Sequence, residues 1–397
     1  GSLMAALIFW GFATLAALVG FALAVAWVRS SPPIGVALVC LTIVLLWERP
    51  TLFFTPIVTL AGGSLYIDDV LTLLLFAAGL LQLRQLRANL RGWLLAWALF
   101  GMLIAVALLR TVVADGLASG VNSIRWLLHF FWAMTWVLGV RTDRLRLHRV
   151  GLIFGWTLVL VAFYHGVMYG FGGPASNVQL GDGAFRTGRV LNAAQSMALL
   201  FCAATVFLGP SGLAKPRPQF YVVSSLVFGG VVVIAQHRSV WAAGALGMGT
   251  VLIWSAQRSA RKWVFVQAGL GVWVLAAWYS SELGRSEIAE SQLNMRTYEW
   301  RTSGWRMLTT EAIARGPVSV ISGEPSASVF FRQIAPGQQT SVSTHNWYMD
   351  IFLYIGLLGL VLLATMLVSA LAKSREISAV WTFVLAAVVG YAWAYTV

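Results

Sequence analysis

The sequence contains few charged residues, which argues against a soluble globular protein. Of 397 residues only 10% are charged, whereas 59% are hydrophobic; soluble domains average about 25% charged residues. Cysteine is also scarce: Cys40 and Cys202 are the only two, and both fall inside apolar runs, so a disulfide framework is not expected. The sequence has no HExxH motif, P-loop or GxSxG elbow, so zinc proteolysis, ATP hydrolysis and the usual hydrolase chemistry have no support.

Long apolar runs are what the sequence has instead. Residues 4–28 form one continuous run, and about 20 such residues cross a bilayer. The run is too long for a cleaved signal peptide and has no basic residues before it. We expect an all-α polytopic membrane protein with about 12 transmembrane helices, at residues 4–28, 34–47, 67–82, 93–110, 124–140, 149–170, 190–209, 219–235, 240–255, 263–279, 348–371 and 377–397. The stretch 48–66 fits either an interfacial segment or a thirteenth short span.

The net charge of +13 would suggest a nucleic-acid partner in a soluble protein, but here its placement indicates membrane topology. Alternate connections differ in Lys and Arg content: 3, 4, 2, 3 and 2 in 83–92, 141–149, 210–218, 256–262 and 372–376, against 0, 2 and 1 in 111–123, 171–189 and 237–239. The basic set is therefore cytoplasmic, and no nucleic acid is implied. The long segment 280–347 falls outside, between membrane helices in 1–279 and 348–397.

The arginines that the outer side does carry are candidates for binding phosphate, because arginine is the natural bidentate partner of that group. They are Arg186 and Arg189 before the helix 190–209, Arg238 in a short turn, and Arg296, Arg301 and Arg306 in an amphipathic stretch. His345 and Asn346 stand at the outer end of the helix 348–371. The alternative is that these side chains reach lipid headgroups or pair with neighbouring acids.

Four further ionisable residues lie at or within the spans. His129 and His165 are inside helices, where an ionisable group is either functional or a hydrogen-bonded packing residue. Asp68 and Asp69 open the span 67–82 and resemble half of a metal site, but no outer His or Cys cluster joins them in the sequence. We therefore expect helix N-capping there and no metal.

Residues 341–363, SVSTHNWYMDIFLYIGLLGLVLL, resemble the O-antigen ligase and polymerase superfamily. Members carry a large periplasmic loop ending in a His-Asn pair, followed by a helix with an acidic or amide position and a G-x-x-G step, here Asp350, Gly356 and Gly359. The sequence HRSVWAAGALG at 237–247 resembles the family's arginine-bearing outer turn, and 296–306 resembles its Arg/Trp helix. The resemblance covers roughly residues 180–365. Two elements depart from it: GPVSVISGEPSASVF at 316–330 replaces a Pro-x-x-Gly-x-Gly turn, and His237 replaces the usual Ser or Thr.

The resemblance implies a GT-C-like fold with one large, partly helical periplasmic loop in the bacterial inner membrane. It implies transfer of a glycan from undecaprenyl pyrophosphate to the core sugars of lipid A in lipopolysaccharide. No cofactor is expected, since the donor is already activated and arginines would balance the pyrophosphate charge. The catalytic candidates are His345, Arg238 and Arg296; those for substrate binding are Arg186, Arg189, Arg301 and Asn346.

Histidine titrates near neutrality, so His345 is assigned as general base for the acceptor hydroxyl, with inversion at the anomeric carbon. The alternative is that His345 binds phosphate or orients the acceptor. The rival activities are an O-antigen polymerase, a transporter or flippase for an anionic lipid, and a metal-dependent oligosaccharyltransferase using Asp68 and Asp69.

Overall fold

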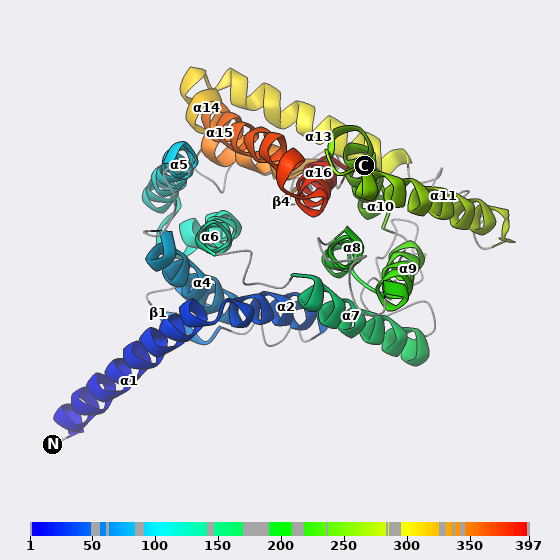
Figure 1. Cartoon of the computed structure of the whole chain (residues 1–397). Helices are drawn as coiled ribbons and strands as arrows, with labels where there is room; N and C mark the ends of the chain where they lie inside the picture. The colour runs from blue at the N-terminus through cyan, green and yellow to red at the C-terminus, as the bar shows by residue number, and fades with distance from the viewer. Residues whose placement is uncertain are drawn as a thin grey trace. The chain divides into compact units, whose positions relative to one another are not determined.

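Helices make up nearly all of the part of the chain that the structure describes (Figure 1). The structure is a computed structural model, and it describes residues 2–48, 56–60, 63–83, 91–140, 147–169, 190–208, 218–235, 237–282, 285, 295–324, 331–335, 338–341 and 346–394. The first half contains α1 (Ser2–Ser30), α2 (Pro32–Glu48), α4 (Ile67–Leu83), α5 (Arg91–Asp115), α6 (Leu117–Gly139) and α7 (Leu147–Tyr169). The second contains α8 (Ala193–Leu208), α9 (Pro218–Ile234), α10 (Arg238–Trp254), α11 (Arg258–Ser280), α13 (Met295–Ala314), α14 (Pro317–Ser322), α15 (Trp347–Ile377) and α16 (Ala379–Ala394).

A helix falls on each of the twelve ranges predicted as membrane spans. Three helices in the described residues are long and apolar enough to cross a bilayer, over Gly92–Asp115, His148–Met168 and Trp347–Arg375. A fourth is added if the bent pair Thr14–Ser30 and Pro32–Cys40 forms one broken span. Shorter apolar helices occupy Ala193–Leu208, Gln219–Ile234, Ser239–Trp254 and Ala379–Gly390. This architecture is that expected of an all-α membrane protein.

The sharp bend between α1 and α2 follows from the sequence Ser31-Pro32-Pro33. Proline has no N–H to donate, and its ring disfavours helical geometry in the residue before it. The chain accordingly turns by 108° between Thr14–Ser30 and Pro32–Cys40. Two spans predicted as independent are thus joined as a bent pair.

The stretch 48–66, for which two alternatives were open, contains a small antiparallel hairpin. Its strands are β1 (Val58–Leu60) and β2 (Gly63–Leu65), with Val58 opposite Leu65. A helix over 58–60 and 63–65 is therefore excluded, while 49–55 and 61–62 lie outside the described residues. A second hairpin, β3 (Phe331–Ala335) with β4 (Gln338–Ser341), lies within the segment 280–347.

Contacts divide the chain into two units. The first comprises Gly1–Leu94 and Val121–Arg146, and the second Leu95–Gly120 and Leu147–Val397. This division is based on contacts within the chain. The predicted division into 1–279, 280–347 and 348–397 is based on membrane topology and therefore stays a prediction.

In the first unit, small residues let α4 and α6 approach closely. A Cβ at Gly79 would lie 2.7 Å from the backbone nitrogen of Trp136, and one at Gly139 would lie 2.8 Å from the carbonyl oxygen of Gly79. Glycine permits backbone-to-backbone contact, as at many membrane helix interfaces. The α4–α6 pair carries the polar network described below.

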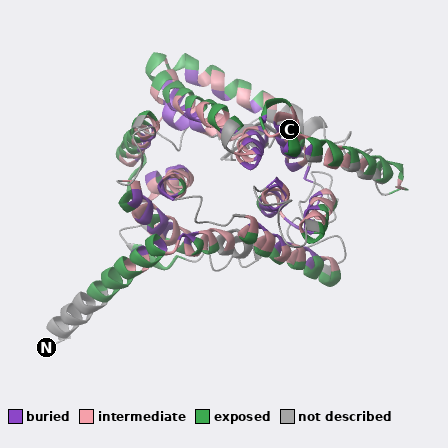
Figure 2. Ribbon diagram, in the orientation of Figure 1, coloured by how far each residue is buried: buried purple, intermediate pink, exposed green. Residues whose placement is uncertain are grey.

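In the second unit, α10 and α16 form the most extensive helix pair, and α8 packs against both. Figure 2 shows the contrast between α8, which is largely buried, and α11, whose surface is mainly exposed. Exposed apolar side chains such as Phe265 and Trp273 on α11 are what a lipid-facing helix presents, since contiguous apolar surface is rare on soluble monomers.

Candidate functional site

The structure describes the side chain of only one of the seven predicted site residues. His345, Arg186 and Arg189 are not among the described residues. Arg238 is the first residue of α10, and Arg296 and Arg301 lie in α13, but only the backbone of these three is described. The roles assigned to all six stay predictions.

Asn346 is described, and its side chain caps α15. Its Oδ1 accepts hydrogen bonds from the backbone nitrogens of Tyr348 (3.0 Å) and Met349 (3.1 Å). Asparagine is a favoured N-cap because its oxygen satisfies amides that have no partner at a helix start. Asn346 therefore fixes where α15 begins, directly after His345, whether or not it also binds substrate.

Helix α13 packs against the first turns of α15. Leu308 and Leu353 form a buried cluster, with the partly buried Met349 and Phe352 packed against it. The contact joins the helix of the Arg/Trp motif to the helix that follows the His-Asn pair. The helices that contain two of the three motifs of the family resemblance therefore pack on one another.

Two buried histidines hold the chain just before α8. His165 Nδ1 lies 2.8 Å from the Val190 carbonyl oxygen, and His237 Nε2 lies 2.8 Å from that of Leu191. Since a carbonyl only accepts, each named ring nitrogen carries the proton and donates. The two side chains are 2% and 7% exposed, so we call this pair the α8 clamp.

Two alternatives were open for His165, a functional group or a hydrogen-bonded packing residue. Its burial and its hydrogen bond in the α8 clamp favour the packing residue. The α8 clamp also gives His237 a role at the position where the family has Ser or Thr. His237 occupies the N-cap position of α10, immediately before Arg238, although its side chain makes no capping hydrogen bond. The clamp thus ties the start of α10 to the segment that follows Arg189 in the sequence.

The start of α8 is further fixed by a reciprocal pair of hydrogen bonds. Asn192 Oδ1 accepts from the Gln195 nitrogen (2.9 Å), and Gln195 Oε1 accepts from the Asn192 nitrogen (3.1 Å). This is the capping-box geometry, which the spacing of three residues allows. Together with the α8 clamp it immobilises residues 190–195.

The G-x-x-G step of α15 contains a break in the helix. Gly356 has φ 71° and ψ −172°, so it interrupts α15. The end of α14 fits against this break: a Cβ at Gly356 would lie 2.6 Å from the nitrogen of Gly323, which itself has φ 73°. The segment 316–330 is the one that differs from the family's Pro-x-x-Gly-x-Gly turn. Its described part, Gly316–Glu324, packs against the break in α15.

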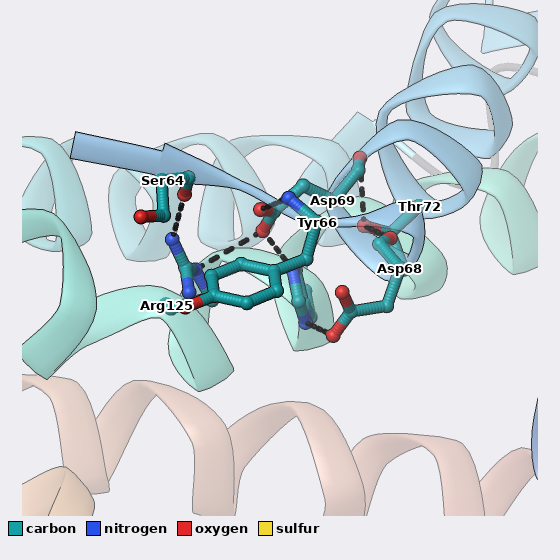
Figure 3. A network of polar contacts seen from close by, with 7 residues as sticks. Ser64, Tyr66, Asp68, Asp69, Thr72 and Arg125 are labelled. Carbon is teal, nitrogen blue, oxygen red and sulfur yellow. Dashed lines mark hydrogen bonds and ion pairs between the residues drawn. The ribbon is translucent and has the colours of Figure 1, made fainter. Parts of the chain in front are cut away.

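The other polar cluster belongs to the first unit and lies at the start of α4 (Figure 3). Asp69 Oδ1 lies 2.7 Å from His129 Nε2 and 3.2 Å from Arg125 Nε, and its Oδ2 accepts from the Tyr66 nitrogen at 2.8 Å. Arg125 also donates to the Ser64 carbonyl (2.6 Å) and lies over the Tyr66 ring, 4.5 Å from its centroid.

In this network, which we call the Asp69 network, the Asp69 carboxylate accepts from the Tyr66 nitrogen and so caps the start of α4 from its third position. Tyr66 holds the N-cap position that was expected of an aspartate. The network also shows that a histidine does join the two aspartates in space, since His129 Nδ1 lies 3.7 Å from Asp68 Oδ2. Sequence spacing could not reveal this, because His129 comes from α6. Among the described residues no group of His, Cys, Asp and Glu is arranged to hold a metal ion.

The chemical role of the Asp69 network follows from its pairing. A carboxylate held by an arginine, an imidazole and a backbone amide is neutralised and fixed in position. It joins α4, α6 and β2 through side chains 10% (Asp69) and 17% (Arg125) exposed. We therefore interpret it as the structural link that holds the β1–β2 hairpin onto the helices.

Comparison with known proteins adds no assignment, since no family model, curated protein or solved structure matches this chain.

Proposed function

We propose that the chain is an O-antigen ligase of the bacterial inner membrane. It takes a glycan from undecaprenyl pyrophosphate and attaches it to the core sugars of lipid A, on the periplasmic side. The fold is the GT-C-like arrangement of about twelve transmembrane helices with one large outer segment. Both substrates are anchored in the membrane, which suits a chain of predominantly apolar helices.

The observation that carries this proposal is the packing of α13 on the first turns of α15, at its predicted outer end. Leu308 and Leu353 meet in a buried cluster, and Asn346 fixes the start of α15 directly after His345. Arg296 and Arg301 belong to the helix that makes this contact. A base and phosphate-binding cations would therefore be supplied from neighbouring elements, as glycosyl transfer from a pyrophosphate requires.

The chemistry is a direct displacement at the anomeric carbon. The acceptor hydroxyl gives its proton to His345 while its oxygen bonds to that carbon, and the bond from the carbon to the phosphate oxygen breaks. The leaving undecaprenyl pyrophosphate keeps the electron pair. Arg186, Arg189, Arg238 and Arg296 balance its charge without a metal, Arg301 and Asn346 bind substrate, and the transferred sugar inverts.

The same donor serves an O-antigen polymerase, whose acceptor is a lipid-linked glycan, and the α13–α15 packing suits either activity. A transporter for an anionic lipid is disfavoured because such proteins carry charges at mid-membrane, whereas the candidate residues here stand at predicted outer helix ends.

The test offers purified protein both acceptors with one donor. Protein in liposomes is given undecaprenyl pyrophosphate carrying a labelled glycan, together with rough lipopolysaccharide. Label on lipopolysaccharide supports the ligase, and lengthening of the lipid-linked glycan instead supports the polymerase. Transfer to neither acceptor contradicts both, and label moving between leaflets without a new bond indicates a transporter.

A further inference from the structure

Helix α14 has one buried and one exposed face, although it contains only the residues Pro317–Ser322. Ser319 is buried, as is Gly323 one turn later. On the opposite face Val318 is 69% and Ile321 48% exposed. Two apolar side chains therefore point away from the protein on a segment that hydropathy alone places in the outer loop 280–347.

The contact of α14 with α15 lies within the apolar part of α15, not at its charged end. Between Asp350 and Lys373, α15 has no charged residue, and such a stretch of about 20 residues matches the apolar core of a bilayer. Gly356, against which α14 docks, comes six residues after Asp350. At a rise of 1.5 Å per residue this is about 9 Å inside the uncharged stretch.

A contact with helix α5 gives a second, independent measure of how far α14 lies from a helix end. Arg110 donates through one guanidinium nitrogen to both the carbonyl and the hydroxyl oxygen of Ser322, each at 3.1 Å. Arg110 lies five residues before Asp115, where α5 ends, or about 7–8 Å inside the span. The two contacts therefore agree on the depth of α14 relative to Asp115 and Asp350, the charged residues at the predicted outer ends of α5 and α15.

Two backbone groups at the end of this segment have protein partners, as an apolar medium demands. The carbonyl of Leu353, one turn before the break in α15, accepts a hydrogen bond from the Glu324 nitrogen at 2.8 Å. The carbonyl at the end of α14 is met by Arg110, and an arginine within a span needs such a partner. These bonds make a re-entrant segment feasible there.

We propose that α14 is a re-entrant helix whose exposed face, Val318 and Ile321, inserts among the acyl chains of the outer leaflet. Neighbouring surfaces are of the same kind: Leu357 and Leu358 on α15 and Val113 on α5 are exposed and apolar. The polar boundary is marked by Arg315, which pairs with Glu311 and lies 3.8 Å from Glu324. Charged groups at such a boundary keep their heads in the polar layer.

This inference does not depend on the proposed glycosyl transfer, and site-directed spin labelling tests it. Single cysteines at Val318 and Ile321 are introduced after Cys40→Ala and Cys202→Ala, labelled with a nitroxide and reconstituted in liposomes. Oxygen concentrates in the acyl region and the nickel chelate NiEDDA in water. We expect oxygen accessibility to exceed that of NiEDDA at both positions, as at the lipid-facing reference Val361.

Two controls make the result decisive. A label at Lys215, in a predicted cytoplasmic connection, reports the value for water. Arg110→Gln, which removes the cationic anchor, should shift the label at Val318 toward that value while Val361 stays unchanged. NiEDDA accessibility equal to or above that of oxygen at Val318 in the otherwise intact protein would overturn the proposal.

Discussion

The backbone of Gly356 in α15 rests directly on that of Gly323 at the end of α14. Both residues have positive φ, 71° and 73°, and a Cβ on Gly323 would lie 2.7 Å from the nitrogen of Ile355. The contact breaks α15 and sets the direction of its first part, Trp347–Ile355. Because Asn346 caps that part of α15, the Gly356–Gly323 junction influences how the predicted catalytic end is oriented.

Gly356→Ala should therefore destabilise the protein. Alanine at φ 71° and ψ −172° is strained, at a cost of about 1–3 kcal/mol, and its methyl group would collide with the backbone of α14. We expect a lower midpoint of thermal unfolding in detergent and reduced glycan transfer. Gly249→Ala, on an open part of α10, is the control and should leave the midpoint unchanged or raised. Equal midpoints for the two variants would refute the role of the junction.

Asp69→Asn should cost more stability than Asp68→Asn. The first change weakens the links to Arg125 and His129, and hydrogen bonds to charged groups are worth about 1.5–3 kcal/mol. The second affects only the longer 3.7 Å approach of Asp68 to His129. Thermal unfolding in detergent measures both. If instead Asp68→Asn abolishes transfer at unchanged stability, and a chelator does the same to wild type, the aspartates are a metal site.

His237→Ala should weaken donor binding without unfolding the protein. The variant loses the hydrogen bond to the Leu191 carbonyl, so residues 190–192, which follow Arg189, lose one of two anchors. We expect KM for the lipid-linked donor to rise more than kcat falls, as measured by steady-state transfer. The exposed Phe163 serves as control, and Phe163→Leu should match wild type. An unchanged KM in His237→Ala would mean that the α8 clamp does not contribute to donor binding.

Variants of Asn346 separate its capping role from substrate binding. Asn346→Ala should cost about 1 kcal/mol by loss of the cap, whereas Asn346→Asp keeps a capping oxygen and therefore stability. A negative charge there would repel a pyrophosphate, so we expect Asn346→Asp to reduce donor affinity although it unfolds like wild type. Full affinity in that variant would mean that Asn346 only caps α15.

Sequence reasoning predicted the helices well because each apolar run is long and bounded by charged or turn residues. Residues 93–110, for example, were expected as a span, and α5 covers them. The predicted span ends at Arg110, however. The structure continues α5 to Asp115 and pairs Arg110 with Ser322, a partner more than two hundred residues away that no local pattern indicates.

The candidate site was less predictable, because its contacts also join residues that are far apart in the sequence. The pairing of His129 with Asp69 and of His237 with the Leu191 carbonyl depends on which helices meet, and sequence spacing does not encode that. The short motif Gly316-Pro317, followed by Gly323, was visible only as a departure from a family pattern. Gly316 and Gly323 both have positive φ, a conformation that favours glycine. The two glycines were therefore the sequence signal for the turns at either end of α14.

His345 is the central residue of the proposed mechanism. The decisive measurement is glycan transfer to rough lipopolysaccharide in EDTA by wild type, His345→Ala and His345→Gln. We predict that wild type transfers without metal, that both variants bind donor, and that neither transfers it, because neither alanine nor glutamine can take the acceptor proton. Wild-type transfer that EDTA abolishes, or undiminished transfer by His345→Ala, would contradict the proposed mechanism.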